Sequence, residues 1–277
     1  MAIFDPEMQA KVGLRLPLYH LFYPFARDRA VMPHSNPGCA KVVNLPRLVE
    51  PQKPLSFAIQ TDDVAARAPL EAFIQQIFRQ VYGAHIGSFY PALISIARPD
   101  GGFAAVAGFR SAAMPLFAEH YLDRPIELQL AKQGVAVERG SIVEMGNLAP
   151  AGAGQARWLI AALTSFLYSA GFSWVIFTAV PVLHNAFGRM GIPLLTLAAA
   201  RRSQLEAGLK DDWGSYYDSS PMVYAADIHA SYRTLSRQIG PGMPRLQALW
   251  LQAQRAGYGY APSVSEENRR HSMASSS

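Results

Sequence analysis

The chain has 277 residues, half of them hydrophobic, so it can bury the core of one large domain or two small ones. Its 25 Lys and Arg against 20 Asp and Glu give a net charge of +5 without long basic blocks, which argues against nucleic-acid binding. A mildly basic surface suits an anionic partner such as coenzyme A, an acidic carrier protein or lipid headgroups. Cys39 is the only cysteine, which excludes a disulfide framework and a thiolate metal cluster.

The first residues, "MAIFDPEMQAKVGLRLPLYHLFYPFARDR", do not have the pattern of a secretory signal. Asp5 and Glu7 stand where a signal peptide carries positive charge, and the stretch has no unbroken apolar core. We therefore expect a cytoplasmic protein. Residues 1–54 are rich in proline and aromatic residues, which predicts an extended N-terminal arm.

The next stretch predicts a strand, a helix and a hairpin. The strand is "SFAIQ", and the amphipathic helix begins at Asp62 and ends at Gly83. "PALISIA" and "FAAVAGFR", joined by "RPDGG", predict a β-hairpin. Helical structure broken at Pro125 is expected in "MPLFAEHYLDRPIELQLAKQG", and a strand in "IVEMGNLA".

In the second half, helices and strands alternate. Helices are expected at Gln155–Ala170 and in "PVLHNAFGRMG", "TLAAARRSQLEAGL" and "RLQALWLQAQRAG", and strands at Trp174–Val180 and in "MVYAADI". This order predicts an α/β fold with a mixed central sheet and flanking helices. We expect the main domain at residues 55–230, a C-terminal helical extension at 231–262 and a disordered polar tail at 263–277.

One uncharged run, Trp158 to Leu183, is long enough to cross a membrane. Gly171 and Pro181 divide it, and its two halves have a helical and a strand-like pattern, respectively. A helix followed by a buried strand is therefore expected instead of a membrane span.

The turn "PAGAGQA" between a predicted strand and helix suggests a phosphate-binding site. Arg157 stands where a dinucleotide-binding fingerprint needs its third glycine, and the G-K-[ST] of a P-loop is absent. What remains is a turn whose backbone amides and helix dipole can hold an anionic group, which makes the stretch Gly152, Ala153, Gly154 and Gln155 the predicted cofactor-binding turn. The alternative is a glycine-rich connection without a ligand.

Several segments occur together in an order that resembles the thermostable hemolysin family. The resemblance covers Phe57 to Ile228 and rests on "FIQQIFRQVYGAHI", "AGFRSA", "PLFAEHYLDRPIE", "IVEMGNLA", "WVIFTA", "LHNAFGRMGI" and "WGSYYDSSPMVYAADI". It implies a mixed central sheet of the GCN5-related N-acetyltransferase type, and a likeness to acyl-homoserine-lactone synthases, which take acyl groups from acyl carrier protein. In that fold the central strand, turn and helix bind the pyrophosphate or pantetheine of the acyl donor. The usual turn has Arg or Gln where Ala149 stands, which favours a carrier protein's phosphopantetheine over coenzyme A as donor.

Glu144 is the predicted general base. Acyl transfer from a thioester needs a base for the amine, a donor to the thioester oxygen and a proton for the leaving thiolate. Glu144 lies between Val143 and Met145 in a predicted core strand, where burial raises the pKa of a carboxyl group, and the likeness to the synthases supports this role. Asn147 is expected to face the same side, so that the two could hold an amine and orient a water. The alternative for Glu144 is a buried ion pair with Arg110.

Substrate-binding residues are expected around this strand. Arg110 could bind a carboxylate of the acceptor. The segment "EHYLDRPIE" predicts a lid over the acceptor that includes Glu119, Tyr121 and Asp123, although a solvated helix end is an equal alternative.

Two tyrosines and two polar residues complete the predicted site. Tyr216 or Tyr217 could protonate the thiolate, with a core role as the alternative. Thr178 and Asn185 could bond the pantetheine amides. The sequence has no H-x-x-x-H, H-E-x-x-H or G-x-S-x-G pattern, so neither a metal site nor a serine hydrolase is expected.

Two functions follow from these patterns. The first is an acyltransferase that moves an acyl group from acyl carrier protein or acyl-CoA onto an amine, such as an amino acid. The second is a membrane-active haemolytic protein without enzymatic activity, which would use "LPLYHLFYPF" and "RLQALWLQAQRAG" for peripheral membrane contact. The acid and the amide inside a predicted core strand favour the first.

Overall fold

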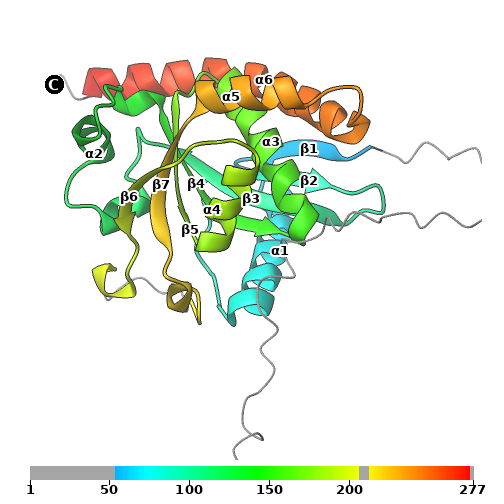
Figure 1. Cartoon of the computed structure of the whole chain (residues 1–277), viewed down its shortest axis with the longest axis horizontal. Helices are drawn as coiled ribbons and strands as arrows, with labels where there is room; N and C mark the ends of the chain where they lie inside the picture. Colours follow the sequence, from blue (N-terminus) through cyan, green and yellow to red (C-terminus); the bar gives the residue numbers. More distant parts are fainter. Residues whose placement is uncertain (1–53, 206–211, 275–277) are drawn as a thin grey trace, which may run out of the picture.

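A mixed sheet of seven strands forms the centre of the protein (Figure 1), in a computed structural model that describes residues 54–205 and 212–274. The strand order is β1-β2-β3-β4-β5-β7-β6. The strands are β1 (Ser56–Gln60), β2 (Ala92–Ala97), β3 (Phe103–Ser111), β4 (Ile142–Pro150), β5 (Trp174–Ala179), β6 (Leu195–Ala199) and β7 (Met222–Asp227). Neighbouring strands are antiparallel except β4 and β5, which are parallel because helix α3 (Ala153–Ser169) crosses between them.

Helices cover both faces of this sheet. Besides α3 they are α1 (Val64–Tyr82), α2 (Ile126–Lys132), α4 (Pro181–Arg189), α5 (Ile228–Gln238) and α6 (Pro244–Ala274), with a short 3₁₀ helix, η3 (Phe117–Tyr121), before α2. In Figure 1, α3, α5 and α6 lie above the sheet and α1 lies below it. The sheet is therefore the middle layer of three.

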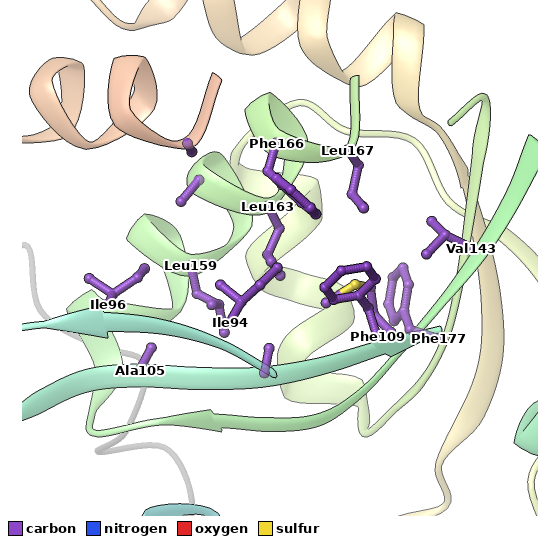
Figure 2. Close-up of a cluster of buried hydrophobic side chains, with 14 of the residues drawn as sticks. Ile94, Ile96, Ala105, Phe109, Val143, Leu159, Leu163, Phe166, Leu167 and Phe177 are labelled. Carbon is purple, nitrogen blue, oxygen red and sulfur yellow. The ribbon is translucent and has the colours of Figure 1, made fainter. Parts of the chain in front are cut away.

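The larger core lies between the sheet and α3. Figure 2 shows side chains of β2, β3 and β4, such as Ile94, Phe109 and Val143, pointing toward Leu163 and Phe166 of α3. Helix α6 packs on the outer side of α3, where a Cβ atom at Gly257 would lie 2.4 Å from the backbone oxygen of Phe166. Glycine at this position allows the two helices to approach closely.

On the opposite face, α1 packs its apolar stripe on the sheet. Leu70, Ile74 and Phe78 are buried against Leu93 and Val106. The helix begins after Asp63, whose carboxylate accepts the amides of residues 65 and 66, and ends at Gly83 in the left-handed conformation, with φ 66°. A separate cluster joins η3 and α2 to β4, β5 and β7.

The expected fold class, an α/β fold with a mixed central sheet and flanking helices, is confirmed. The uncharged run divides into α3 and β5, as predicted. Among the described residues, no helix combines the length and the apolar character needed to cross a membrane.

The helix predicted for "TLAAARRSQLEAGL" is wrong, because Leu195–Ala199 forms edge strand β6 and pairs with β7. Backbone pairing at the sheet edge outweighs the helical preference of the alanines. Most of helix α5 lies in the predicted helical extension, and the expected limit between the main domain and this extension, at residue 230, falls inside the helix.

The structure also differs from the prediction at the C-terminal end of the chain. Helix α6 continues to Ala274, into the stretch assigned by composition to a disordered tail. The predicted N-terminal arm lies outside the described residues, except for Pro54.

Candidate active site

The parallel strands β4 and β5 separate near the middle of the sheet. Their pairing runs from Ile142↔Trp174 to Met145↔Phe177, after which β4 continues beside β3 alone. A cavity of about 190 Å³ lies at this gap, lined on one side by residues 145–148 of β4 and on the other by residues 177–180. Because other lining residues come from both faces, the cavity passes through the sheet.

On the α3 face the cavity is apolar. Its walls come from α3, α4, β5 and β7 and include Leu159, Ile160, Leu163, Leu167, Phe177 and Phe187. The hydroxyls of Thr164 and Ser231 also belong to lining residues, but both donate to backbone oxygens of their own helices or helix ends. This compartment suits a hydrocarbon chain.

On the α1 face the cavity is aromatic. Its walls include Phe78, Tyr82, Tyr90, Phe117, Trp213 and Tyr216. Arg110 is the only charged side chain among the lining residues that the structure describes. This compartment suits a small molecule with an apolar part and an anionic group.

Glu144 lies behind the aromatic compartment and does not line it. Its side chain is 1% exposed, and its two carboxylate oxygens accept the backbone amides of Phe117 at 2.8 Å and Ala118 at 2.7 Å. The Nε atom of Arg110 lies 3.6 Å from Oε2. Burial raises the pKa of the Glu144 carboxyl above its ordinary value, against the lowering effects of Arg110, the two amides and the Tyr90 hydroxyl. Glu144 thus anchors η3 to the sheet as well as being a buried acid.

Tyr90 connects Glu144 to the cavity and was not identified from the sequence. It lines the aromatic compartment, and its hydroxyl interacts with the Glu144 carboxyl, so that each group shifts the pKa of the other. Burial and the Glu144 charge raise the pKa of Tyr90 well above its ordinary value, so the hydroxyl stays protonated. The guanidinium carbon of Arg110 lies 4.1 Å from the centre of its ring.

The Tyr90 ring lies on two strand glycines. A Cβ atom at Gly146 would lie 2.3 to 2.6 Å from ring atoms and the hydroxyl oxygen, and one at Gly108 would lie 2.7 Å from the Tyr90 Cβ. Gly108 and Gly146 pair directly across β3 and β4. Isolated glycines inside strands often mark the close approach of another group, so these two were the available sequence signal for Tyr90.

Asn147 fixes the backbone that carries Tyr90. Its Oδ1 accepts the amide of Tyr90 at 3.1 Å, and its Nδ2 donates to the backbone oxygen of Ser88 at 3.3 Å. Regular alternation would place Asn147, three residues after Glu144, on the opposite face. Its φ of 47° and a register shift against β3 instead turn its side chain to the Glu144 side. Its amide group is therefore committed to Ser88 and Tyr90.

Arg110 lies between Glu144 and the cavity. This position is compatible with both predicted roles, the ion pair with Glu144 and the binding of an acceptor carboxylate. One of its terminal nitrogens donates to the backbone oxygen of Pro115 at 3.2 Å, while its buried Nε makes no hydrogen bond. The long ion pair with Glu144 and the lining position coexist. A carboxylate in the aromatic compartment would find this cation next to it.

Of the three lid residues predicted from "EHYLDRPIE", the structure brings only Tyr121 to the cavity. Glu119 instead binds Arg139 at 2.6 Å and accepts the amides of Leu116 and Ile126, which holds η3 together. Asp123 is exposed and pairs with Arg124 at 2.8 Å. The solvated and structural alternative therefore describes these two acids.

The remaining predicted polar residues divide in the same way. Tyr216 lines the cavity and donates to the backbone oxygen of Thr178 at 3.3 Å, at the edge of the strand gap. The hydroxyl of Tyr217 lies 2.6 Å from that of Tyr121, but Tyr217 is not a lining residue. Asn185 is exposed, because α4 turns Leu183 and Phe187 toward the cavity.

The turn at residues 152–155 lies between two lining residues, Pro150 and Ala156. Gly152 precedes the first residue of α3 and offers no side-chain cap, so amides of the first helical turn remain available to a ligand. A Cβ atom at Gly152 would lie 3.2 Å from Oε1 of Gln155. The turn could hold an anionic group at the mouth of the cavity.

Residues 60–232 match the family described as thermostable hemolysin. The chain belongs to this family. The resemblance seen in the sequence is thereby confirmed, and the match ends just after the start of α5. No curated protein is a sequence match.

Several solved structures are similar in fold to this thermostable hemolysin family member. An apo form of TofI shows 12% identity and a TM-score of 0.47, with 68% of this chain and 99% of that chain covered. FeeM, an N-acyl amino acid synthase from uncultured soil microbes, shows 11% identity and a TM-score of 0.45, with 67% and 98% covered. BjaI, a CoA-dependent acyl-homoserine lactone synthase with SAM and isopentyl-CoA, shows 13% identity and a TM-score of 0.43, with 71% and 99% covered. At these scores the likenesses do not bear on the chemistry of the site.

Proposed function

We propose that the protein is an acyltransferase that moves an acyl group from a thioester donor onto a small amine. The observation that carries the proposal is the cavity through the β4–β5 gap, which joins an apolar compartment on one face to an aromatic compartment with Arg110 on the other. A reaction that links a hydrocarbon chain to a polar acceptor needs two such compartments that meet at one point.

The donor would enter from the side of the turn. Its acyl chain would lie in the α3 compartment, and its phosphopantetheine arm in the gap beside Thr178. The amides at residues 152–155 would bind a phosphate group. Both acyl-CoA and acyl carrier protein present such an arm, and Ala149, whose side chain is buried under α1, offers no cation or amide to a pyrophosphate.

The acceptor would occupy the aromatic compartment. A carboxylate on the acceptor would bind Arg110, as in an amino acid, while its amine faces the gap. The absence of an acid among the described lining residues argues against a polyamine, whose several charges would be left without partners.

The chemistry needs a proton acceptor and a proton donor at the gap. Glu144 is the buried base in this proposal, and Tyr216 is the donor for the leaving thiolate, since its hydroxyl reaches the end of β5. In the structure the Tyr216 hydroxyl donates to the backbone oxygen of Thr178. When the donor binds, the same hydroxyl would donate to the thiolate instead.

The test is the release of free thiol by the purified full chain. The chain is mixed with acyl-CoA or acyl carrier protein loaded with chains of several lengths, with and without a panel of amino acids and simple amines. We expect thiol release that depends on the amine and yields an N-acyl product by mass spectrometry. Omission of the amine is the control for plain thioester hydrolysis.

The same preparation is tested for leakage of dye from anionic and zwitterionic vesicles. Leakage without any amine-dependent thiol release would contradict the enzyme and support the haemolytic alternative. Lysis that appears only after acyl transfer would identify the N-acyl product, which has the structure of a surfactant, as the lytic agent.

A further inference from the structure

Glu144 cannot take a proton directly from an acceptor held in the aromatic compartment. It is 1% exposed and is not a lining residue, and a backbone amide donates to each of its oxygens. A general base must come within hydrogen-bond distance of the proton that it removes. Another group has to stand between the amine and Glu144.

Tyr90 is the residue in that position. Its ring lines the compartment and its hydroxyl interacts with the Glu144 carboxyl, while the same hydroxyl lies against Gly146 of the cavity-lining strand β4, where a Cβ atom would be 2.6 Å from it. We propose that Tyr90 is a catalytic residue that relays the proton of the acceptor amine to Glu144. This proposal rests on the acyltransferase function proposed above.

The surrounding residues fix Tyr90 in one place. Gly108 and Gly146 leave room for the ring against the sheet, and the Asn147 amide holds the backbone that leads into Tyr90, from Ser88 to the Tyr90 amide. Such fixation is expected of a group that must stay within reach of both partners, because a displacement of about 1 Å can cost about a hundredfold in rate.

Arg110 supports the same role. Its guanidinium lies over the Tyr90 ring, with 4.1 Å between its carbon and the ring centre, and its Nε lacks a hydrogen-bond partner. A cation in this place stabilises negative charge that develops on the phenolic oxygen while the proton moves. The same cation can hold an acceptor carboxylate, which would bring the amine to Tyr90.

The nitrogen lone pair of the neutral amine attacks the thioester carbonyl carbon, a C–N bond forms, and the C=O electron pair moves to the oxygen. The nitrogen gives its proton to the Tyr90 oxygen as the Tyr90 proton passes to the Glu144 carboxylate. The carbonyl then re-forms, the C–S bond breaks, and the thiolate leaves with the electron pair and takes a proton from Tyr216. Proton exchange with solvent afterwards returns Glu144 and Tyr216 to their starting states.

The test compares Tyr90→Phe with wild type in the thiol-release assay. The variant keeps the ring on the two glycines and under Arg110 and removes only the hydroxyl. We expect kcat to fall by about a hundredfold, with an unchanged thermal unfolding midpoint to within a few degrees. Tyr168→Phe is the matched control, because Tyr168 packs on His229 and Tyr232 away from the cavity, and it should keep wild-type activity.

A pH profile separates a relay from a role in positioning. With a weakly basic acceptor amine that stays neutral over the pH range, kcat/KM of wild type should fall toward acid pH as Glu144 becomes protonated; in Tyr90→Phe this acid limb should disappear, because the amine proton then goes to water. A residual activity that retains the wild-type acid limb would show that Tyr90 only positions the substrate, and would overturn the proposal. Activity of Tyr90→Phe within threefold of wild type would also overturn it.

A measurement on wild type covers the case in which Tyr90→Phe does not fold. With a slow acceptor, the rate is measured in mixtures of H₂O and D₂O. A relay moves two protons in one step and predicts a curved dependence on the D₂O fraction, whereas a straight line overturns it. If wild type releases no thiol with any amine, the acyltransferase function itself has failed and the relay fails with it.

Discussion

Two pairs of glycines lie close to the cavity, and they differ in what they permit. Gly152 and Gly154 form the turn that stands out in the sequence, yet Gly152 has an extended backbone, with φ 176° and ψ −174°, and a Cβ atom at Gly154 would meet nothing within 4 Å. Gly108 and Gly146 look unremarkable inside their strands, yet a Cβ atom on either would collide with Tyr90. The requirement for glycine comes from the residue that approaches it, and a local motif does not show that approach.

The largest effect is expected for Gly146→Ala. A methyl group there would overlap the Tyr90 ring, and overpacking of this kind costs about 1–3 kcal/mol of unfolding free energy. Alanine in place of glycine within a strand would otherwise stabilise by about 0.5–1 kcal/mol, so the sign of the change is informative. Urea denaturation measures the stability, and thiol release should be lost together with it. A stabilised or fully active variant would contradict the close packing of the Tyr90 ring on Gly146.

An intermediate effect is expected from the protonation of the buried Glu144 carboxyl. Burial raises the pKa of Glu144 above its ordinary 4.5, so the folded protein binds this proton more tightly than the unfolded chain. The contribution of Glu144 to stability therefore declines as the pH rises from about 4.5 through the raised value, by about 1.4 kcal/mol for each pH unit between the two.

Glu144→Gln lacks this proton, so wild type should lose stability relative to the variant between pH 4 and pH 8. Urea unfolding of both proteins at several pH values measures the difference. The opposite trend would mean that Arg110 and the two amides outweigh burial and hold the carboxyl charged.

The smallest effect is expected for Gly154→Ala in the turn. The position is helical and open, so alanine should stabilise the protein by about 0.4–1 kcal/mol through the unfolded state. If the amides bind a donor phosphate, the added methyl group should raise KM for the donor severalfold and leave KM for the amine unchanged. A destabilised variant would show that the turn glycine is as constrained as the strand glycines, and would remove the contrast between the two pairs.

The sequence predicted most of the fold because most of the signals are local. The strand "IVEMGNLA", the helix after it and α1 follow from periodicity and capping; the predicted start of α1 at Asp62 is one residue before its Asp63 cap, and its predicted end at Gly83 is the observed one. Strand β6 was missed because "TLAAA" has a helical composition, and only its pairing with β7, which comes later in the chain, makes it a strand.

The site was harder to predict because its key contacts join distant segments. Glu144 and Arg110 could be expected to meet, since they lie on strands that pair. Tyr90 could not, because its place depends on Gly108, on Gly146 and on the positive φ of Asn147. A pattern of alternating residues does not show where a strand changes face.

The short pairing of β4 with β5 divides the sheet into a four-stranded and a three-stranded part. Within the described part of the chain, strand pairing between the four-stranded part, β1 to β4, and the three-stranded part, β5 to β7, is limited to the register from Ile142↔Trp174 to Met145↔Phe177. Beyond this seam the facing edges of both parts carry backbone amides and carbonyls that no strand partner takes. A thioester arm with amide groups of its own, lying in the gap, would supply those partners and complete the sheet as an eighth strand.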